Sequence, residues 1–142
     1  MNTTSRTVYD FQGTDINGMM VDFRQYIGRV LLIVNTASKG GSYKEIRQLS
    51  DLQRQMAGRP FDILAFPCDQ FLSKERSNTE DIQDFYFTRE KVPFTVFHKV
   101  KVKGDNKSPL FKWLKTRVDY PKHKKIDGNF TKFLIASDGV SV

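Results

Sequence analysis

The sequence contains very little cysteine, and this scarcity limits the chemistry that the chain can carry. Cys68 is the one cysteine among 142 residues, so an intrachain disulfide is impossible. There are also only two histidines, and no cluster of cysteine and histidine, so the sequence predicts no metal site and no cofactor. A chain without disulfides suits a reducing compartment. We therefore expect a cytoplasmic location, with a mitochondrial one left open.

Long hydrophobic runs are missing as well. The sequence has no stretch of about 18 apolar residues, which predicts that nothing spans a membrane. Its opening residues, MNTTSRTVYDF, lack the apolar segment of a secretory signal. We therefore expect a chain without a membrane span or a leader of this kind.

What the sequence does contain is a series of apolar runs with strand and helix spacing. Asn17-Gly18 separates two short apolar-rich runs and predicts a β-hairpin. Residues 29–36 and 61–66 are almost continuously apolar, which is typical of strands buried on both faces. Between them, apolar residues recur at helical spacing over residues 43–56. This order predicts a β-α-β unit with parallel strands.

Further elements are expected in the second half of the chain. Ser77 is followed three residues later by Glu80, which matches a capping box at a helix start. Residues 93–100 predict a third strand, and Pro109 is suited to the first position of a short helix.

The last predicted elements complete a mixed sheet. Residues 129–142 predict a strand, a turn at Asp138-Gly139 and the first residues of a returning strand. The expected fold class is therefore α/β: a sandwich with a mixed central sheet, an N-terminal β-hairpin and flanking helices. We find no repeat or linker and expect a single domain over residues 1–142.

Positive charge is distributed unevenly along the chain. Residues 98–125 hold ten Lys or Arg and two Asp, a charge of +8, whereas the whole chain carries +7. Such a region is compatible with an acidic protein partner, a nucleic acid or an anionic membrane, although a solvated lysine-rich surface is the simpler explanation because charge alone is poor evidence for a partner. No nucleic-acid-binding motif accompanies it. The candidate binding residues are Lys99, Lys101, Lys103, Lys107, Lys112, Lys115, Arg117, Lys122, Lys124 and Lys125.

Four stretches of the sequence together resemble the glutathione peroxidase family: NTASK, ILAFPCDQF, KGDNKSPL and NFTKFLI. The resemblance runs from about Val8 to Val140. It implies a thioredoxin-like fold, and an ancestral reduction of hydrogen peroxide or lipid hydroperoxides by a thiol or selenol. That reaction needs an ionised, exposed sulfur or selenium, and the start of a helix after a central strand stabilises such an anion.

The reacting group is missing from the corresponding motif. The family's motif resembles ASKCG, or its selenocysteine form, whereas this sequence reads ASKGGSY. Either Gly40 replaces the nucleophile or a short deletion removes it, and the shortness of the segment favours a deletion. Both routes leave no sulfur at this position.

Other positions that the resemblance implies have changed too, with one exception. Lys74 stands where the family has a glutamine, and Gly128 stands where it has a tryptophan. Phe87 occupies the place of the resolving cysteine of many members. Asn129 is retained, and we expect it to bond local backbone. Cys68 follows an apolar strand, so we expect it to be buried and slow to react.

Three functions remain open on this evidence. A catalytically inactive family member, serving as a structural or binding subunit, accounts for the lost groups. A weak thiol peroxidase would act through Cys68, and a binder of nucleic acid or of an acidic partner would use residues 98–125. The family's final helix also has no counterpart before Val142, so we expect an uncovered sheet surface that, with the basic face, contacts a protein partner.

Overall fold

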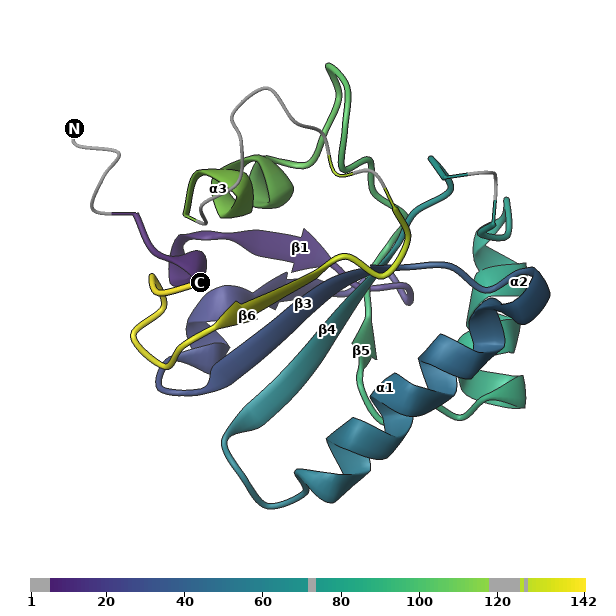
Figure 1. The fold of residues 1–142 in the computed structure, drawn as a ribbon, viewed down its shortest axis with the longest axis horizontal. Coiled ribbons are helices and arrows are strands. Elements are labelled where there is room, and N and C mark those ends of the chain that lie inside the picture. The colour runs from purple at the N-terminus through teal and green to yellow at the C-terminus, as the bar shows by residue number, and fades with distance from the viewer. Residues whose placement is uncertain (1–5, 72–73, 118–125, 127) are drawn as a thin grey trace.

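A four-stranded sheet forms the centre of the computed structural model, which describes residues 6–71, 74–117, 126 and 128–142 (Figure 1). Its strand order is β5-β4-β3-β6. The first three are mutually parallel, and β6 runs antiparallel to β3, which confirms the predicted α/β class with a mixed sheet. The strands are β3 (Val30–Thr36), β4 (Phe61–Pro67), β5 (Thr95–Val96) and β6 (Lys132–Ile135).

Helices cover the two faces of this sheet. Helices α1 and α2 lie on one face and α3 lies on the other (Figure 1). Because α1 connects β3 to the parallel strand β4, the expected β-α-β unit is present. The helices are α1 (Tyr43–Gln55), α2 (Thr79–Gln83), a π-helical continuation of α2 (Asp84–Arg89) and α3 (Pro109–Arg117).

Each face of the sheet has its own hydrophobic core, and β3 contributes to both. Leu31 and Ile33 belong to the core on the α3 face, whereas Leu32 and Val34 belong to the core on the α1 face. This division follows from strand geometry, because successive side chains point to opposite faces. The continuous apolar run that predicted a doubly covered strand is therefore explained.

The predicted N-terminal hairpin is also present. Strands β1 (Gln12–Thr14) and β2 (Met20–Asp22) pair antiparallel around the Asn17-Gly18 turn. Gly18 has φ +87°, a left-handed conformation that a glycine adopts without steric cost. An isolated bridge between Asp15 and Phe97 joins this hairpin to the main sheet.

Two predicted details of the middle of the chain are wrong. The N-cap of α2 is Asn78 rather than Ser77, because the Asn78 side chain accepts a hydrogen bond from the backbone N–H of Asp81 at 2.8 Å. The third strand is limited to β5, because the regular ladder with β4 is interrupted after Phe97. The N–H of His98 donates to Thr14 O of the hairpin at 3.0 Å, and Val100 N–H then donates to Pro67 O of β4 at 2.9 Å.

The segment after β6 differs from its prediction too. A turn forms at Asp138-Gly139, but residues 140–142 form no returning strand. The turn instead packs on the start of the chain, where Val8 N–H donates to Gly139 O at 2.9 Å and Tyr9 O–H donates to Ser137 O at 3.0 Å. A Cβ atom at Gly139 would lie 2.4 Å from the Tyr9 ring, so this contact requires glycine.

Candidate functional site

The turn that leads into α1 is the place where the family resemblance puts the reacting group. A 3₁₀ turn, Gly40–Ser42, precedes the helix. The N–H groups of Ser38 and Lys39 both donate to Lys74 O, at 3.0 and 2.7 Å, so this turn is tied to the loop after β4. Gly40 has φ +61°, and among described atoms a Cβ there would meet only Lys74 Nζ, at 3.8 Å. The structure thus brings together two of the changed positions, Gly40 and Lys74.

Two further family positions, Gly128 and Asn129, lie just before β6. Gly128 O accepts hydrogen bonds from Asn35 Nδ2 at 3.1 Å and from the Thr131 hydroxyl at 2.9 Å. A side chain at Gly128 would meet no described atom within 4 Å of its Cβ. Asn129 Nδ2 donates to Phe71 O at 3.4 Å, a backbone carbonyl 58 residues away rather than the local backbone that was expected. Its Oδ1 is buried without a partner in the described part of the chain.

A buried polar network lies beside the α1 turn, and the sequence analysis missed it. The Glu75 side chain is 1% exposed, and it accepts hydrogen bonds from the Ser38 hydroxyl, from Tyr86 O–H at 2.7 Å and from Arg76 N–H at 2.8 Å. Thr36 Oγ1 lies 2.8 Å from the Tyr86 oxygen. Since the Tyr86 proton goes to Glu75, the Thr36 hydroxyl donates to Tyr86. The network therefore joins β3, the α1 turn, the loop after β4 and the π-helix.

Both acidic groups of this network have raised pKa values, so each retains its proton to a higher pH than usual. Burial raises the pKa of the Glu75 carboxyl, an effect that its hydrogen bonds oppose. Burial also raises the pKa of Tyr86 well above its usual value. Neither a carboxyl nor a phenol supplies a redox-active sulfur. The role of the network is therefore structural: its hydrogen bonds hold the surrounding loops in position. One signal was available in the sequence: Tyr86 shares the apolar helix face of Ile82 and Phe85, and a buried phenol needs a hydrogen-bond partner.

Cys68 lies directly after β4 and is fully buried, as expected. Its side chain belongs to the core on the α3 face, whereas Gly40 leads into the helix on the opposite face. The thiol lies 3.6 Å from Gln70 Oε1, and burial raises the pKa of this thiol above its usual value. The arrangement places no thiolate at the start of α1.

The lysine side chains of the basic region 98–125 lie in different environments. Lys99 Nζ lies 2.9 Å from the Asp69 carboxylate, and Lys103 Nζ lies 4.7 Å from the centre of the Phe71 ring. Lys101 is exposed on the connecting loop and Lys115 is half-buried on α3. Lys122, Lys124 and Lys125 lie outside the described residues.

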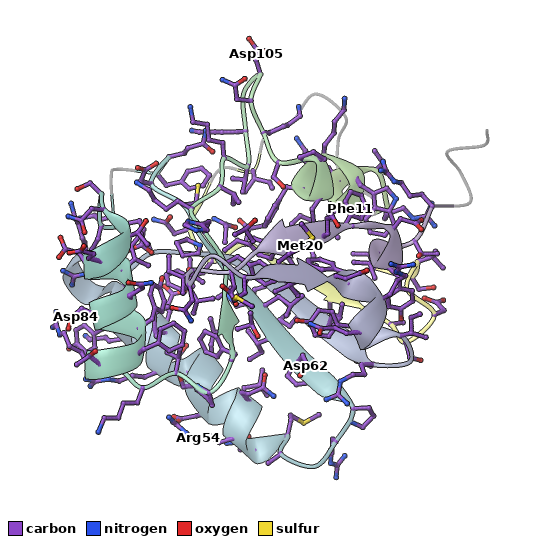
Figure 2. The ribbon with its side chains drawn as sticks, turned by 180° about the vertical axis from the view of Figure 1, so that it is seen from behind. Phe11, Met20, Arg54, Asp62, Asp84 and Asp105 are labelled. Atoms are coloured by element: carbon purple, nitrogen blue, oxygen red, sulfur yellow. The ribbon has the colours of Figure 1, made fainter. Side chains whose placement is uncertain are left out.

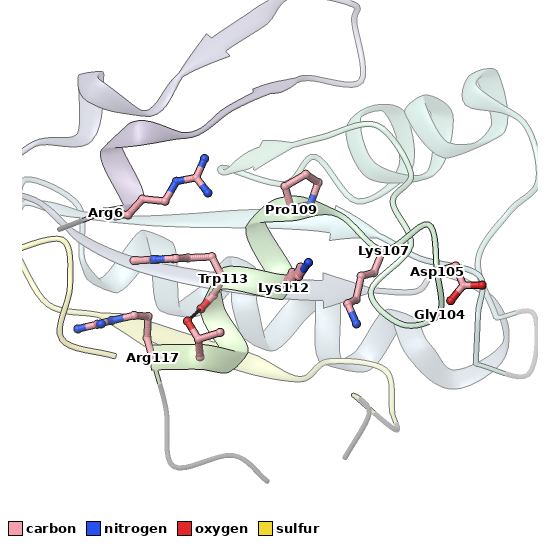
Figure 3. Close-up of a pocket in the computed structure, with 9 residues that line it drawn as sticks. Arg6, Gly104, Asp105, Lys107, Pro109, Lys112, Trp113 and Arg117 are labelled. Carbon is pink, nitrogen blue, oxygen red and sulfur yellow. Dashed lines mark hydrogen bonds between the residues drawn. The ribbon is translucent and has the colours of Figure 1, made fainter. Parts of the chain in front are cut away.

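The remaining basic residues of this region gather around a cavity. Lys107, Lys112 and Arg117 line a hollow of about 920 Å³ beside α3, together with Arg6 (Figure 3). Arg6 comes from the opposite end of the sequence, so no reading of residues 98–125 alone places it here. On one side the hollow is bounded by a loop that projects from the body of the molecule, with Asp105 at its tip (Figure 2).

Two further properties concern all of the described residues together. None of their helices is both long and apolar enough to cross a bilayer. They also hold no group of three or more His, Cys, Asp or Glu side chains arranged to bind a metal ion.

Comparison with solved structures defines the class of fold. A thiol:disulfide interchange protein of the thioredoxin family from Chlorobium tepidum TLS superimposes with a TM-score of 0.68, covering 97% of this chain and 84% of that chain. Its sequence is 15% identical, so the likeness concerns the fold alone. The fold is thioredoxin-like, as the resemblance implied.

Closer similarities define the family. Residues 8–115 match the glutathione peroxidase family model. Probable glutathione peroxidase 5 of Arabidopsis thaliana is 40% identical over 139 residues, which is 97% of this chain and 80% of the relative. The crystal structure of Trgpx in apo form has a TM-score of 0.78 at 33% identity and covers 97% of this chain and 83% of that chain. The chain belongs to the glutathione peroxidase family.

Proposed function

We propose that this chain is a member of the glutathione peroxidase family that does not reduce hydroperoxides and serves as a structural or binding subunit. The observation that carries the proposal is the pair of positions Gly40 and Cys68. Gly40, at the turn into α1, has no side chain, and Cys68, the only thiol, is 0% exposed on the other face of the sheet. Peroxide reduction needs an accessible thiolate, and a buried thiol with a raised pKa is neither accessible nor ionised.

A peroxidase assay tests this proposal directly, since the family relatives carry peroxidase names. Hydrogen peroxide and a lipid hydroperoxide would be offered with glutathione or with reduced thioredoxin, and their consumption followed. We expect the wild-type chain and Cys68→Ser to match the protein-free rate, with an active family enzyme as positive control. Turnover by the wild-type chain that Cys68→Ser loses would overturn the proposal and establish a weak thiol peroxidase acting through Cys68.

The binding role has a candidate surface at β6. This strand lies at the edge of the sheet, and its Leu134 side chain is 56% exposed opposite the buried Leu32 of β3. Lys132, on the same face of the strand, is exposed as well. An uncovered apolar side chain on an edge strand favours pairing with another chain. We propose that this strip, together with the basic face, serves in assembly with a protein partner.

Self-assembly is the simplest form of this role to measure. Sedimentation over a wide concentration range is expected to show association of the wild-type chain, and Leu134→Lys is expected to abolish it. Met19→Lys is the matched control, because Met19 is 66% exposed on the N-terminal hairpin, away from β6. A wild-type chain that stays monomeric throughout would count against assembly through β6.

A cytoplasmic location is proposed on the cysteine content. One unpaired thiol suits a reducing compartment. Microscopy of the tagged full-length protein, with the tag placed at either end in turn, would test this; a mitochondrial signal with the C-terminal tag would contradict it.

A further inference from the structure

The cavity beside α3 has the form of a small-molecule site. Pro109, Lys112, Trp113 and Thr116 line it, and their spacing places them on one face of the helix (Figure 3). Its volume of about 920 Å³ lies within the range of roughly 300–1,000 Å³ that is usual for ligand pockets. The reverse face of α3, with Phe111 and Leu114, is buried in the core. This packing fixes the position of the helix that forms the wall of the cavity.

The charges around this cavity are unbalanced. Arg6, Lys107, Lys112 and Arg117 line it, and Asp105 is the one acidic residue among the described lining residues. Elsewhere in the described chain several cations are paired, as Arg29 is with Asp62, Arg47 with Glu90 and Lys99 with Asp69.

Most cations of the cavity, in contrast, have no carboxylate partner among the described residues. No described carboxylate lies within ion-pair distance of Arg6, Lys107 or Lys112. Arg117 donates from Nε to Val140 O at 3.3 Å. Hydrogen bonds from Ser141 and Val140 lower the pKa of Asp138 to about 2, and the Arg117 charge adds a smaller contribution. The cavity therefore concentrates positive charge that the described residues do not neutralise.

An aromatic side chain holds one of these cations, Arg6, at the rim. The Arg6 guanidinium lies 4.5 Å from the centre of the Phe11 ring, and that ring contacts Trp113 at 5.4 Å. Trp113 is only 8% exposed, so it packs under the cavity and offers little surface for stacking a base. A guanidinium fixed in this way loses little conformational freedom when it binds an anion.

We propose that this cavity binds a small soluble ligand that carries several phosphate groups. Guanidinium groups bind phosphate oxygens in bidentate fashion, and ammonium groups add point charges. Four cations against one carboxylate suit a ligand with several negative charges, and a hollow of about 920 Å³ suits a compact ligand better than an extended nucleic acid. The inference gives the proposed binding role a ligand class. It does not require that the chain lack peroxidase activity, so the two proposals fail separately.

Inorganic triphosphate is the probe, and the chain supplies its own reporter. Trp113 is the only tryptophan of the sequence and lines the cavity, so its fluorescence reports on this site. We expect a saturable change with one site per chain, confirmed by calorimetry. Orthophosphate should bind more weakly because it carries fewer charges, and added salt should weaken both.

Charge reversal inside and outside the cavity distinguishes binding at this site from a general attraction of the anion to a positively charged protein. The double variant Lys107→Glu with Lys112→Glu is expected to weaken triphosphate binding about tenfold or more, since each reversal replaces an attractive charge by a repulsive one. Lys112→Arg should retain binding. The control is Lys44→Glu, an exposed lysine of α1 on the opposite face of the sheet, which should bind within about twofold of wild type.

Several outcomes would overturn the inference. They are no saturable binding at low salt, an equal loss in Lys44→Glu, and tighter binding to duplex DNA or phosphatidylserine vesicles that survives the double variant. Thermal melting checks that the variants are folded. If the double variant is unfolded, Lys112→Gln replaces it, because this exposed side chain makes no described core contact, and its failure to weaken binding would be equally decisive.

Discussion

The polar groups at the α1 turn are buried and hydrogen-bonded, whereas those at the α3 cavity are charged and lack described carboxylate partners. At the α1 turn, Glu75 and Tyr86 are buried and bonded to each other and to neighbouring hydroxyls, so neither of the two is directed at an outside molecule. At the α3 cavity, Lys107 and Lys112 face a hollow without a described carboxylate partner. The difference shows where each kind of polar residue contributes: satisfied buried groups stabilise the fold, whereas unpaired surface charges are available to bind.

The largest expected effect concerns the support of the α3 cavity. Phe111 is 0% exposed and makes edge contacts with Phe66 at 5.4 Å and Phe133 at 6.1 Å. Phe111→Ala should lower the free energy of unfolding by about 3–5 kcal/mol, because it leaves a void in a packed core. Urea denaturation measures this loss. Phe87→Ala, at a side chain 37% exposed, should cost much less, and equal losses would show that α3 is not anchored through its core.

A smaller loss is expected from the polar network of the α1 turn. Tyr86→Phe removes the hydroxyl that donates to Glu75 and accepts from Thr36, so both partners lose a buried hydrogen bond. We expect the free energy of unfolding to fall by about 1–3 kcal/mol. Tyr43→Phe, at a half-exposed residue of α1, is the matched control and should change little. A Tyr86→Phe variant as stable as wild type would mean that the network contributes nothing to the fold.

A sulfur introduced at the α1 turn should be exposed, unlike that of Cys68. Gly40→Cys, made in a Cys68→Ser background, should cost about 1–2 kcal/mol because Gly40 has φ +61°. Its thiol, close to Lys74 Nζ, should react with a disulfide reagent in the native state, whereas Cys68 of the wild-type chain should react only after unfolding.

Hydroperoxide turnover by Gly40→Cys should nevertheless stay far below family rates. Lys74 and Gly128 do not rebuild the surroundings of the reacting group, and misplacement by about 1 Å can cost a factor of 100. Substantial turnover by this variant would show that loss of the sulfur alone separates this chain from an active enzyme.

The smallest expected effect is a pH dependence of stability at the same network. Burial raises the pKa of Glu75 in the folded state, so the folded chain holds this proton more tightly than the unfolded chain does. Its contribution to stability is therefore complete below the unfolded value of about 4.5 and is lost as pH rises through the folded value. Urea denaturation across this window should show a steeper decline with pH in the wild-type chain than in Glu75→Gln. Glu80→Gln, an exposed control, should follow the wild type.

The sequence predicted the elements whose signals are local. Asn17-Gly18 specifies its hairpin turn through backbone conformation, and the apolar run of β3 specifies a doubly covered strand. The α2 cap was placed one residue early, because Ser77 and Asn78 are both good N-caps with an acidic residue three positions later. Only the packing of the helix decides between them.

The parts that escaped prediction depend on distant contacts. Glu75 sits in the polar stretch LSKERS, which reads as a solvated loop, and it is buried only because Ser38 and Tyr86 surround it. Arg6 joins the α3 cavity from more than a hundred residues away in sequence. Composition showed that residues 98–125 are basic, but a three-dimensional arrangement was needed to separate Lys99, which pairs with Asp69, from Lys107 and Lys112, which have no described carboxylate partner.

The closing turn after β6 has a consequence for how the chain reaches its native state. Tyr9 bonds Ser137 across 128 residues of sequence, and Gly139 gives the Tyr9 ring the space it needs. During synthesis on the ribosome, the N-terminal segment therefore waits for its native partner until nearly the whole domain has emerged. Contacts so distant along the chain are expected to make the final folding step slow.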